Sequence, residues 1–272
     1  MSANVSAIPM RPNIKIKNIA LPLEHGSWGF VFEPLIAGLL IAFSPSAIWI
    51  TLLVVGAFLA RQPLKVLLND WIAKRNLPQT SVALKFVLIY GSISLFGAVG
   101  SLAFTKLDSF LPFLFVMPFA VYQIYCDASR KSREVLPELT GSIAVSSSIA
   151  VLALADNWTF PAAVTLWGIF IARLIPSILY VRNRLKLEKG KQFSQIIPFL
   201  ANLVAFVFVA MLTYKGFASL ITTAMFAVLL VRSTIGLSKY RSKIKAMRIG
   251  VWEVVYGTLT AISVVLGYYL GV

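Results

Sequence analysis

Long hydrophobic runs separated by short polar segments dominate this sequence. The nine runs are Trp28–Phe43, Ala47–Ala60, Val82–Phe104, Phe110–Tyr125, Leu139–Ala155, Phe160–Tyr180, Ile196–Tyr214, Ser219–Leu237 and Val251–Leu270. A membrane-spanning helix needs about 20 mostly apolar residues, and the runs lack the alternation that is typical of barrel strands. In lipid, a helix satisfies its backbone polar groups within one segment. We therefore predict an all-α polytopic membrane helix bundle of about nine transmembrane helices.

This pattern also predicts how the chain is organised. Residues 1–20 are polar and mildly basic, which indicates a flexible cytoplasmic leader. Residues 21–272 then form a single transmembrane helical domain, because nine spans leave room only for short loops. The run that starts at Ala47 could continue to Trp71 as one long helix bent near Pro63, where the proline ring removes a backbone hydrogen bond.

The composition supports a membrane protein. Of the 272 residues, 58% are hydrophobic and 13% are charged, whereas about a quarter of the residues in a soluble domain are charged. The mean hydropathy is +0.83. The net charge of +15 fits loops that contact anionic headgroups better than it fits nucleic-acid binding. The expected partner is the lipid bilayer, and the single cysteine, Cys126, excludes an internal disulfide.

The basic residues indicate an orientation. Of the 25 lysines and arginines, 22 fall in the leader or around the segments that follow the second, fourth, sixth and eighth runs. Lys106 and Lys215 lie on the other side, and Arg173 lies within the sixth run. The positive-inside rule then places the amino terminus in the cytoplasm, in a bacterial plasma membrane or a thylakoid. Seven of the ten carboxylates sort to the same side, which favours an ion-paired polar cavity there; local charge compensation is the alternative.

Candidate chemistry begins at the entry to the first run. Glu24 stands beside His25, the only histidine, and an imidazole that titrates near neutrality can move protons or bind a substrate. Both are catalytic candidates; the alternative is an interfacial anchor. Further along the same run lies Glu33, a substrate-binding candidate. A carboxylate inside an apolar span is costly and suggests function, with Arg173 as a candidate partner.

A second group follows the second run. Arg61, Lys65 and Asn69 recur at every fourth residue and therefore share one helical face, with Gln62 and Asp70 on the adjacent stripe. This face could hold an anionic headgroup or a diphosphate, with Asp70 as a catalytic candidate. A solvated helix end is the alternative.

A third group precedes the fifth run. Arg130, Glu134 and Glu138 are spaced by four residues in a polar segment that re-enters the membrane. Arg130 is a binding candidate and Glu138 a catalytic one. The alternative for Glu138 is a structural role at a helix N-terminus, where the dipole favours a carboxylate.

A fourth group forms a polar stripe along the sixth run. Arg173, Ser177, Tyr180 and Arg184 lie on one helical face, which favours an inward-facing anion site over a snorkelling arginine. Weaker cavity candidates are Arg232, Glu253 and Tyr256.

Several of these motifs resemble the YwiC-like family of bacterial membrane proteins. They are Pro22-x-Glu24-His25-Gly26-x-Trp28, Arg61-Gln62-Pro63, Glu138-Leu139-x-Gly141 and Tyr180-x-Arg182-x-Arg184. The resemblance implies membership of this family and does not imply a particular activity.

The helix layout is also similar to that of the UbiA superfamily of intramembrane prenyltransferases. That resemblance implies a cytoplasm-facing cavity and a lipid or isoprenoid substrate. Its first aspartate-rich motif is matched at Asn69 and Asp70 only, with Ala73 in place of an aspartate, and the second is replaced by the basic stretch 180–184. Magnesium needs several oxygen ligands, so magnesium is not supported, and the identity of any cofactor is unknown. Arginines can hold phosphate without metal, so an anionic amphiphile remains the expected ligand. The alternatives are a small-anion transporter and a non-catalytic assembly factor.

Overall fold

The computed structural model describes residues 16–22, 25–75, 77–132 and 134–271, and these contain helices and no strand. The helices in chain order are α1 (Ile16–Ala20), α2 (His25–Ile41), α3 (Ala47–Ile72), α4 (Pro78–Phe104), the 3-10 helix η1 (Leu107–Phe110), α5 (Leu111–Ala128), α6 (Val135–Ser146), α7 (Ser148–Ala155), α8 (Phe160–Glu188), α9 (Ile196–Tyr214), α10 (Leu220–Leu237) and α11 (Ala246–Leu270).

The predicted membrane bundle is confirmed. Within the described ranges, eight helical segments are long and apolar enough to cross a bilayer, with α6 and α7 together counted as one of them. A shorter apolar helix, Gly26–Ile41, lies within α2. Together they give the bundle of about nine helices that the hydrophobic runs predicted.

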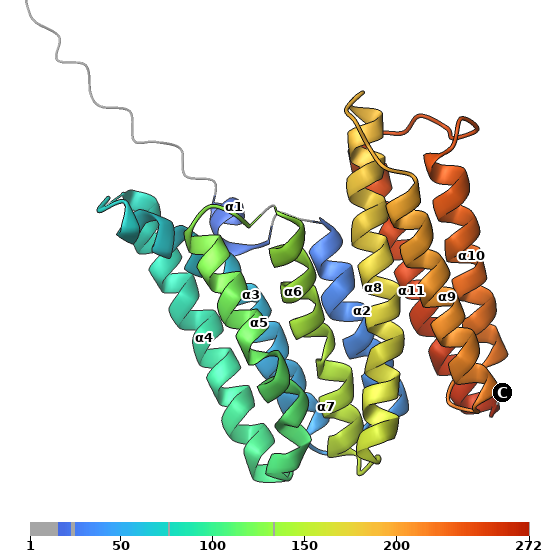
Figure 1. Ribbon diagram of the computed structural model, residues 1–272. Helices are drawn as coiled ribbons and strands as arrows, with labels where there is room; N and C mark the ends of the chain where they lie inside the picture. The colour runs from blue at the N-terminus through green and yellow to red at the C-terminus, as the bar shows by residue number, and fades with distance from the viewer. Residues whose placement is uncertain (1–15, 23–24, 76, 133, 272) are drawn as a thin grey trace, which may run out of the picture.

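The helices form two groups joined by a central layer (Figure 1). α3, α4 and α5 make one group, and α8 to α11 make the other. α2, α6 and α7 lie between them, and the side chains of Ile149–Ala153 in α7 are completely buried there. α1 and the carboxyl-terminal end of α11 lie at opposite ends of the bundle (Figure 1), as an odd number of crossings requires.

Local structure differs from the expectation at two places and agrees with it at a third. Residues 16–20, expected as part of a flexible leader, form α1, whose Ile19 and Ala20 are buried against the bundle. α3 does continue through Pro63 to Ile72. The fifth predicted run is split at Ser147, because the Ser146 and Ser147 hydroxyls donate to the carbonyls of Ile143 and Ala144, and such bonds compete with the helical pattern.

Candidate functional site

A cavity of about 810 Å³ opens among α2, α3, α5, α6, α8 and α11. Ligand cavities typically measure roughly 300–1,000 Å³. Most of its wall is apolar, including Phe30, Leu53, Phe58, Phe113 and Val116. Six of its polar residues gather towards the ends of α3 and α5 and the start of α6, and they are Arg61, Lys65, Gln123, Asp127, Ser132 and Glu138. Ser27, Ser142 and Glu253 line it elsewhere. The cavity therefore combines a long apolar wall with a polar end.

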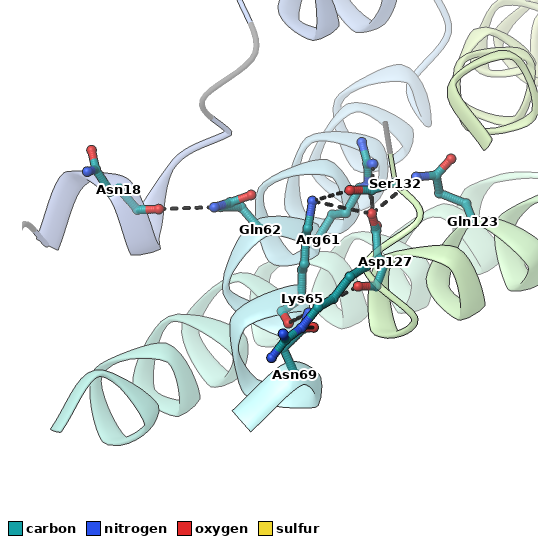
Figure 2. A network of polar contacts seen from close by, with 9 residues as sticks. Asn18, Arg61, Gln62, Lys65, Asn69, Gln123, Asp127 and Ser132 are labelled. Carbon is teal, nitrogen blue, oxygen red and sulfur yellow. Dashed lines mark hydrogen bonds and ion pairs between the residues drawn. The ribbon is translucent and has the colours of Figure 1, made fainter. Parts of the chain in front are cut away.

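Asp127, in the last turn of α5, lies at the centre of the hydrogen bonds at this polar end (Figure 2). Only 2% of Asp127 is exposed. Arg61 donates from Nε and Nη2 to the two carboxylate oxygens, at 2.8 and 3.2 Å. Lys65 Nζ lies 3.7 Å from Asp127 Oδ1 and donates to Ser132 Oγ at 2.6 Å. Asn69 donates to the Asp127 backbone carbonyl at 3.0 Å. Arg61, Lys65, Asn69, Gln123, Asp127 and Ser132 are called the Asp127 cluster below.

The cluster carries an excess of positive charge. Arg61 and Lys65 pair with the Asp127 carboxylate, and Arg130 Nε donates to Asn69 Oδ1 at 3.2 Å and adds a third cation nearby. Glu138, the other carboxylate of this polar end, pairs with Arg182. Arg61 has five N–H donors and Lys65 has three, and Asp127 and Ser132 occupy only some of them. The remaining donors are available to an anion that enters the cavity.

Two other predicted residues of this region have different surroundings. Gln62 donates to the Asn18 carbonyl at 3.0 Å and so ties α3 to α1 (Figure 2). Asp70 accepts from Gln79 Nε2 at 3.1 and 3.2 Å and from Thr80 Oγ1 at 2.8 Å. Asp70 thus joins the end of α3 to the start of α4, and it is not among the residues that line the cavity.

Glu138 lies in the first turn of α6 and lines the cavity. Its carboxylate accepts from Arg182 Nη1 of α8 at 2.6 Å. This ion pair connects the central layer to the second helix group. Glu24 and the His25 side chain lie outside the described residues, although the next residues, Gly26 and Ser27, line the cavity.

A second polar group lies among α2, α8, α10 and α11. Arg173, which is 1% exposed, donates to Glu253 Oε1 at 2.9 Å and to the Glu253 carbonyl at 3.0 Å. Arg173 Nη2 lies 3.8 Å from Glu33 Oε1. Arg232 donates to the other oxygen of Glu253. We call Glu33, Arg173, Arg232 and Glu253 the membrane-interior network, and its two positive and two negative charges balance.

The polar stripe of α8 faces α10 and α11. Ser177 is buried beside Glu253, and the Tyr180 ring lies under the Arg232 guanidinium. Arg184 donates to the carbonyls of Gly236 and Ser242 and pairs with Glu188 at 2.9 Å. The four residues therefore share one face, as predicted, and each has partners within the protein.

Sequence reasoning missed Asp127 and Gln123 as site residues. Asp127 is one of only ten acidic residues and lies two residues past the predicted run Phe110–Tyr125, a signal that could have selected it. Gln123, whose amide lies 3.4 Å from Asp127 Oδ1, carried no such signal. Among the described residues, no three His, Cys, Asp or Glu side chains form a group that could hold a metal ion.

Comparison with known proteins identifies a family for part of this chain. A family model described as "YwiC-like protein" matches residues 21–154, a stretch that contains the whole Asp127 cluster. The comparison with curated proteins and the comparison with solved structures gave no match. The UbiA-like layout accordingly stays a prediction.

Proposed function

We propose that this chain, which belongs to the YwiC-like family, binds an anionic amphiphile with its headgroup at the Asp127 cluster and its tail in the apolar cavity. The observation that carries the proposal is the cavity of about 810 Å³, apolar along most of its wall and positively charged at one end. A ligand that combines an apolar chain with an anionic group matches both parts.

The headgroup would meet preorganised donors. Asp127 holds Arg61 by two hydrogen bonds, so the guanidinium is already oriented and loses little freedom when an anion binds. Lys65 and Ser132 are joined by a 2.6 Å hydrogen bond and would add a second cation and a hydroxyl. Hydrogen bonds between ionised groups are about twice as strong as neutral ones, and a phosphate offers several oxygens to such a set.

The tail would lie along α3 and α5. The lining residues of α3 extend from Leu53 to Leu68, which is ~23 Å at the 1.5 Å helical rise per residue. Those of α5 extend from Phe113 to Asp127, or ~21 Å by the same rise. Burial of apolar surface contributes about 0.8 kcal/mol per methylene, so a chain of this length supplies much of the affinity.

Both a phospholipid and an isoprenoid phosphate have the chemistry required. The UbiA-like layout would make the ligand an isoprenoid substrate, handled by the basic cluster without magnesium. A phospholipid would make the protein a lipid-binding factor. The two sources share a phosphate on an apolar chain, and the experiment separates them.

The test uses the full chain in phosphatidylcholine nanodiscs, with bound molecules measured by native mass spectrometry. Lysophosphatidylglycerol and farnesyl phosphate are the two anionic probes. Monoacylglycerol has the chain without the charge, and glycerophosphate has the charge without the chain. We expect at least one anionic probe to bind about tenfold or more tightly than either control compound, because charged hydrogen bonds contribute ~1.5–3 kcal/mol each. Which anionic probe binds more tightly decides between the two sources.

The matched variants are Lys65→Gln, which keeps the Arg61–Asp127 pair, and Lys215→Gln on the other predicted face of the membrane. Lys65→Gln should weaken anionic binding about tenfold, and Lys215→Gln should leave it unchanged. Equal binding of monoacylglycerol would contradict the anionic headgroup. Equal binding of glycerophosphate would contradict the amphiphile and favour transport of a small anion.

A further inference from the structure

The membrane-interior network contains only two groups that can change charge. Arginine stays protonated at all accessible pH values, so Arg173 and Arg232 are fixed positive charges. Any proton that the network gains or loses must therefore reside on Glu33 or Glu253. The charged groups that act on Glu33 are Arg173, Glu253 and Arg232, which come from α8, α11 and α10.

The two glutamates are held very differently. Glu253 receives Arg173 at 2.9 Å on one oxygen and Arg232 on the other. Glu33 has one ion pair, at 3.8 Å from Arg173, and within the described part of the chain no hydrogen bond reaches its carboxylate. Glu253 is therefore fixed as the anion between both arginines, and Glu33 is the more loosely held carboxyl group.

Glu33 also lies beside a second opening. A groove of about 260 Å³ runs between α2 and α11, lined by Glu33, Trp28, Ile36, Leu40, Thr258 and Ile262, among others. Ile36 is 48% exposed and Ile262 46% exposed, and in helices that cross the membrane such side chains face lipid. The Glu33 carboxylate fits there because Gly29 and Gly257 present no side chain against it.

We infer that Glu33 is a proton-binding carboxyl group of the membrane interior that small apolar molecules reach from the bilayer through the α2–α11 groove. The inference does not depend on the amphiphile site, since the groove is distinct from the larger cavity. Gain of a proton at Glu33 leaves two arginines facing one carboxylate, so the network becomes positively charged. The site would thus store a proton inside the bundle.

The reagent that tests this inference is dicyclohexylcarbodiimide, an apolar molecule that reacts with protonated carboxyl groups. The carboxyl oxygen adds to the central carbon of the reagent while the acid proton moves to a nitrogen. The acyl group then migrates from that oxygen to the nitrogen, giving a stable N-acylurea from which no group has left. The adduct is located by digestion and mass spectrometry of the full chain labelled in nanodiscs.

We expect the adduct on Glu33, forming several-fold more slowly at pH 8.5 than at pH 6, and none on Glu253. A water-soluble carbodiimide should instead label Asp108, which is exposed in η1, and Asp156, which directly follows α7. Both arms use the unaltered protein, so no loss of folding can imitate the result. Labelling of Glu253 in place of Glu33, an unlabelled Glu33, or a rate independent of pH would each overturn the inference.

Discussion

Arg232 places a positive charge in the membrane interior between two aromatic rings. Its guanidinium carbon lies 4.3 Å from the centroid of the Tyr180 ring and 4.4 Å from that of Tyr256. The same group donates to Glu253. Gly236 leaves room for the Tyr180 hydroxyl, where a β-carbon would collide. A desolvated cation above an aromatic ring contributes ~2 kcal/mol of interaction energy. Arg232 therefore stabilises the packing of α8, α10 and α11.

Arg232→Met should therefore destabilise the protein by about 3–5 kcal/mol, because one carboxylate of the network would lose its buried counterion. The measurement is unfolding of the purified protein in a mild detergent. Adding Glu253→Gln to that variant should recover part of the loss, since the unpaired charge is removed with its partner. Arg248→Met, at an exposed position of α11, is the control. No recovery in the double variant would contradict a charge-balanced network.

Among the elements, the α3–α4 connection depends on Asp70. Replacing it with alanine removes acceptors used by Gln79 and Thr80, and we expect a loss of about 1–3 kcal/mol. Limited proteolysis within residues 73–77 should also be faster in the alanine variant. Asp70→Asn, which keeps one acceptor oxygen, should lose less. If alanine abolished ligand binding without lowering stability, the sequence-based prediction of a catalytic Asp70 would be favoured instead.

The elements were largely predictable because the apolar runs are long and sharply bounded. Ile196–Tyr214 coincides with α9. The end of α8 was underestimated, since its last turns are polar and hydrophobicity alone does not register them. The extension of α3 past Pro63 was anticipated to within one residue. The α6–α7 break was missed because three adjacent serines fit either a continuous helix or an interruption.

Helical spacing predicted part of the candidate site. It placed Arg61, Lys65 and Asn69 on one face, and all three contact Asp127. The cost of a carboxylate inside an apolar span separately suggested that Glu33 pairs with Arg173, and the two do form an ion pair. Helical spacing could not show that Asp127, 66 positions after Arg61, joins the residues of that face, because such contacts depend on how α3 packs against α5. For the same reason it could not show that Asp70, on the adjacent stripe, contacts Gln79 and Thr80 at the start of α4.

In the whole molecule, the larger cavity is lined by residues of both the Asp127 cluster and the membrane-interior network. The Asp127 cluster forms its polar end, and Glu253 of the membrane-interior network contributes to its wall. Interactions between charges are weakly screened where water is excluded. A change of charge in the network should therefore alter the affinity of the cavity for a charged ligand, even though Glu33 itself faces the α2–α11 groove.

If both proposals hold, proton uptake by Glu33 should strengthen the binding of an anionic amphiphile. The network is neutral with both glutamates ionised and gains one positive charge when Glu33 takes a proton, so affinity should rise as the pH falls. Couplings between sites commonly amount to fivefold or more in affinity. Lysophosphatidylglycerol is the suitable probe, because its phosphodiester keeps the same charge from pH 6 to pH 8.5.

Glu33→Gln should bind the probe as tightly as the unaltered protein does at low pH, and its affinity should no longer vary with pH. Since linkage is reciprocal, the bound probe should also speed the labelling of Glu33 by dicyclohexylcarbodiimide at a fixed pH. Binding that is independent of pH in the unaltered protein would separate the two sites while leaving the amphiphile proposal intact. Retained pH dependence in Glu33→Gln would assign the proton to another titratable group.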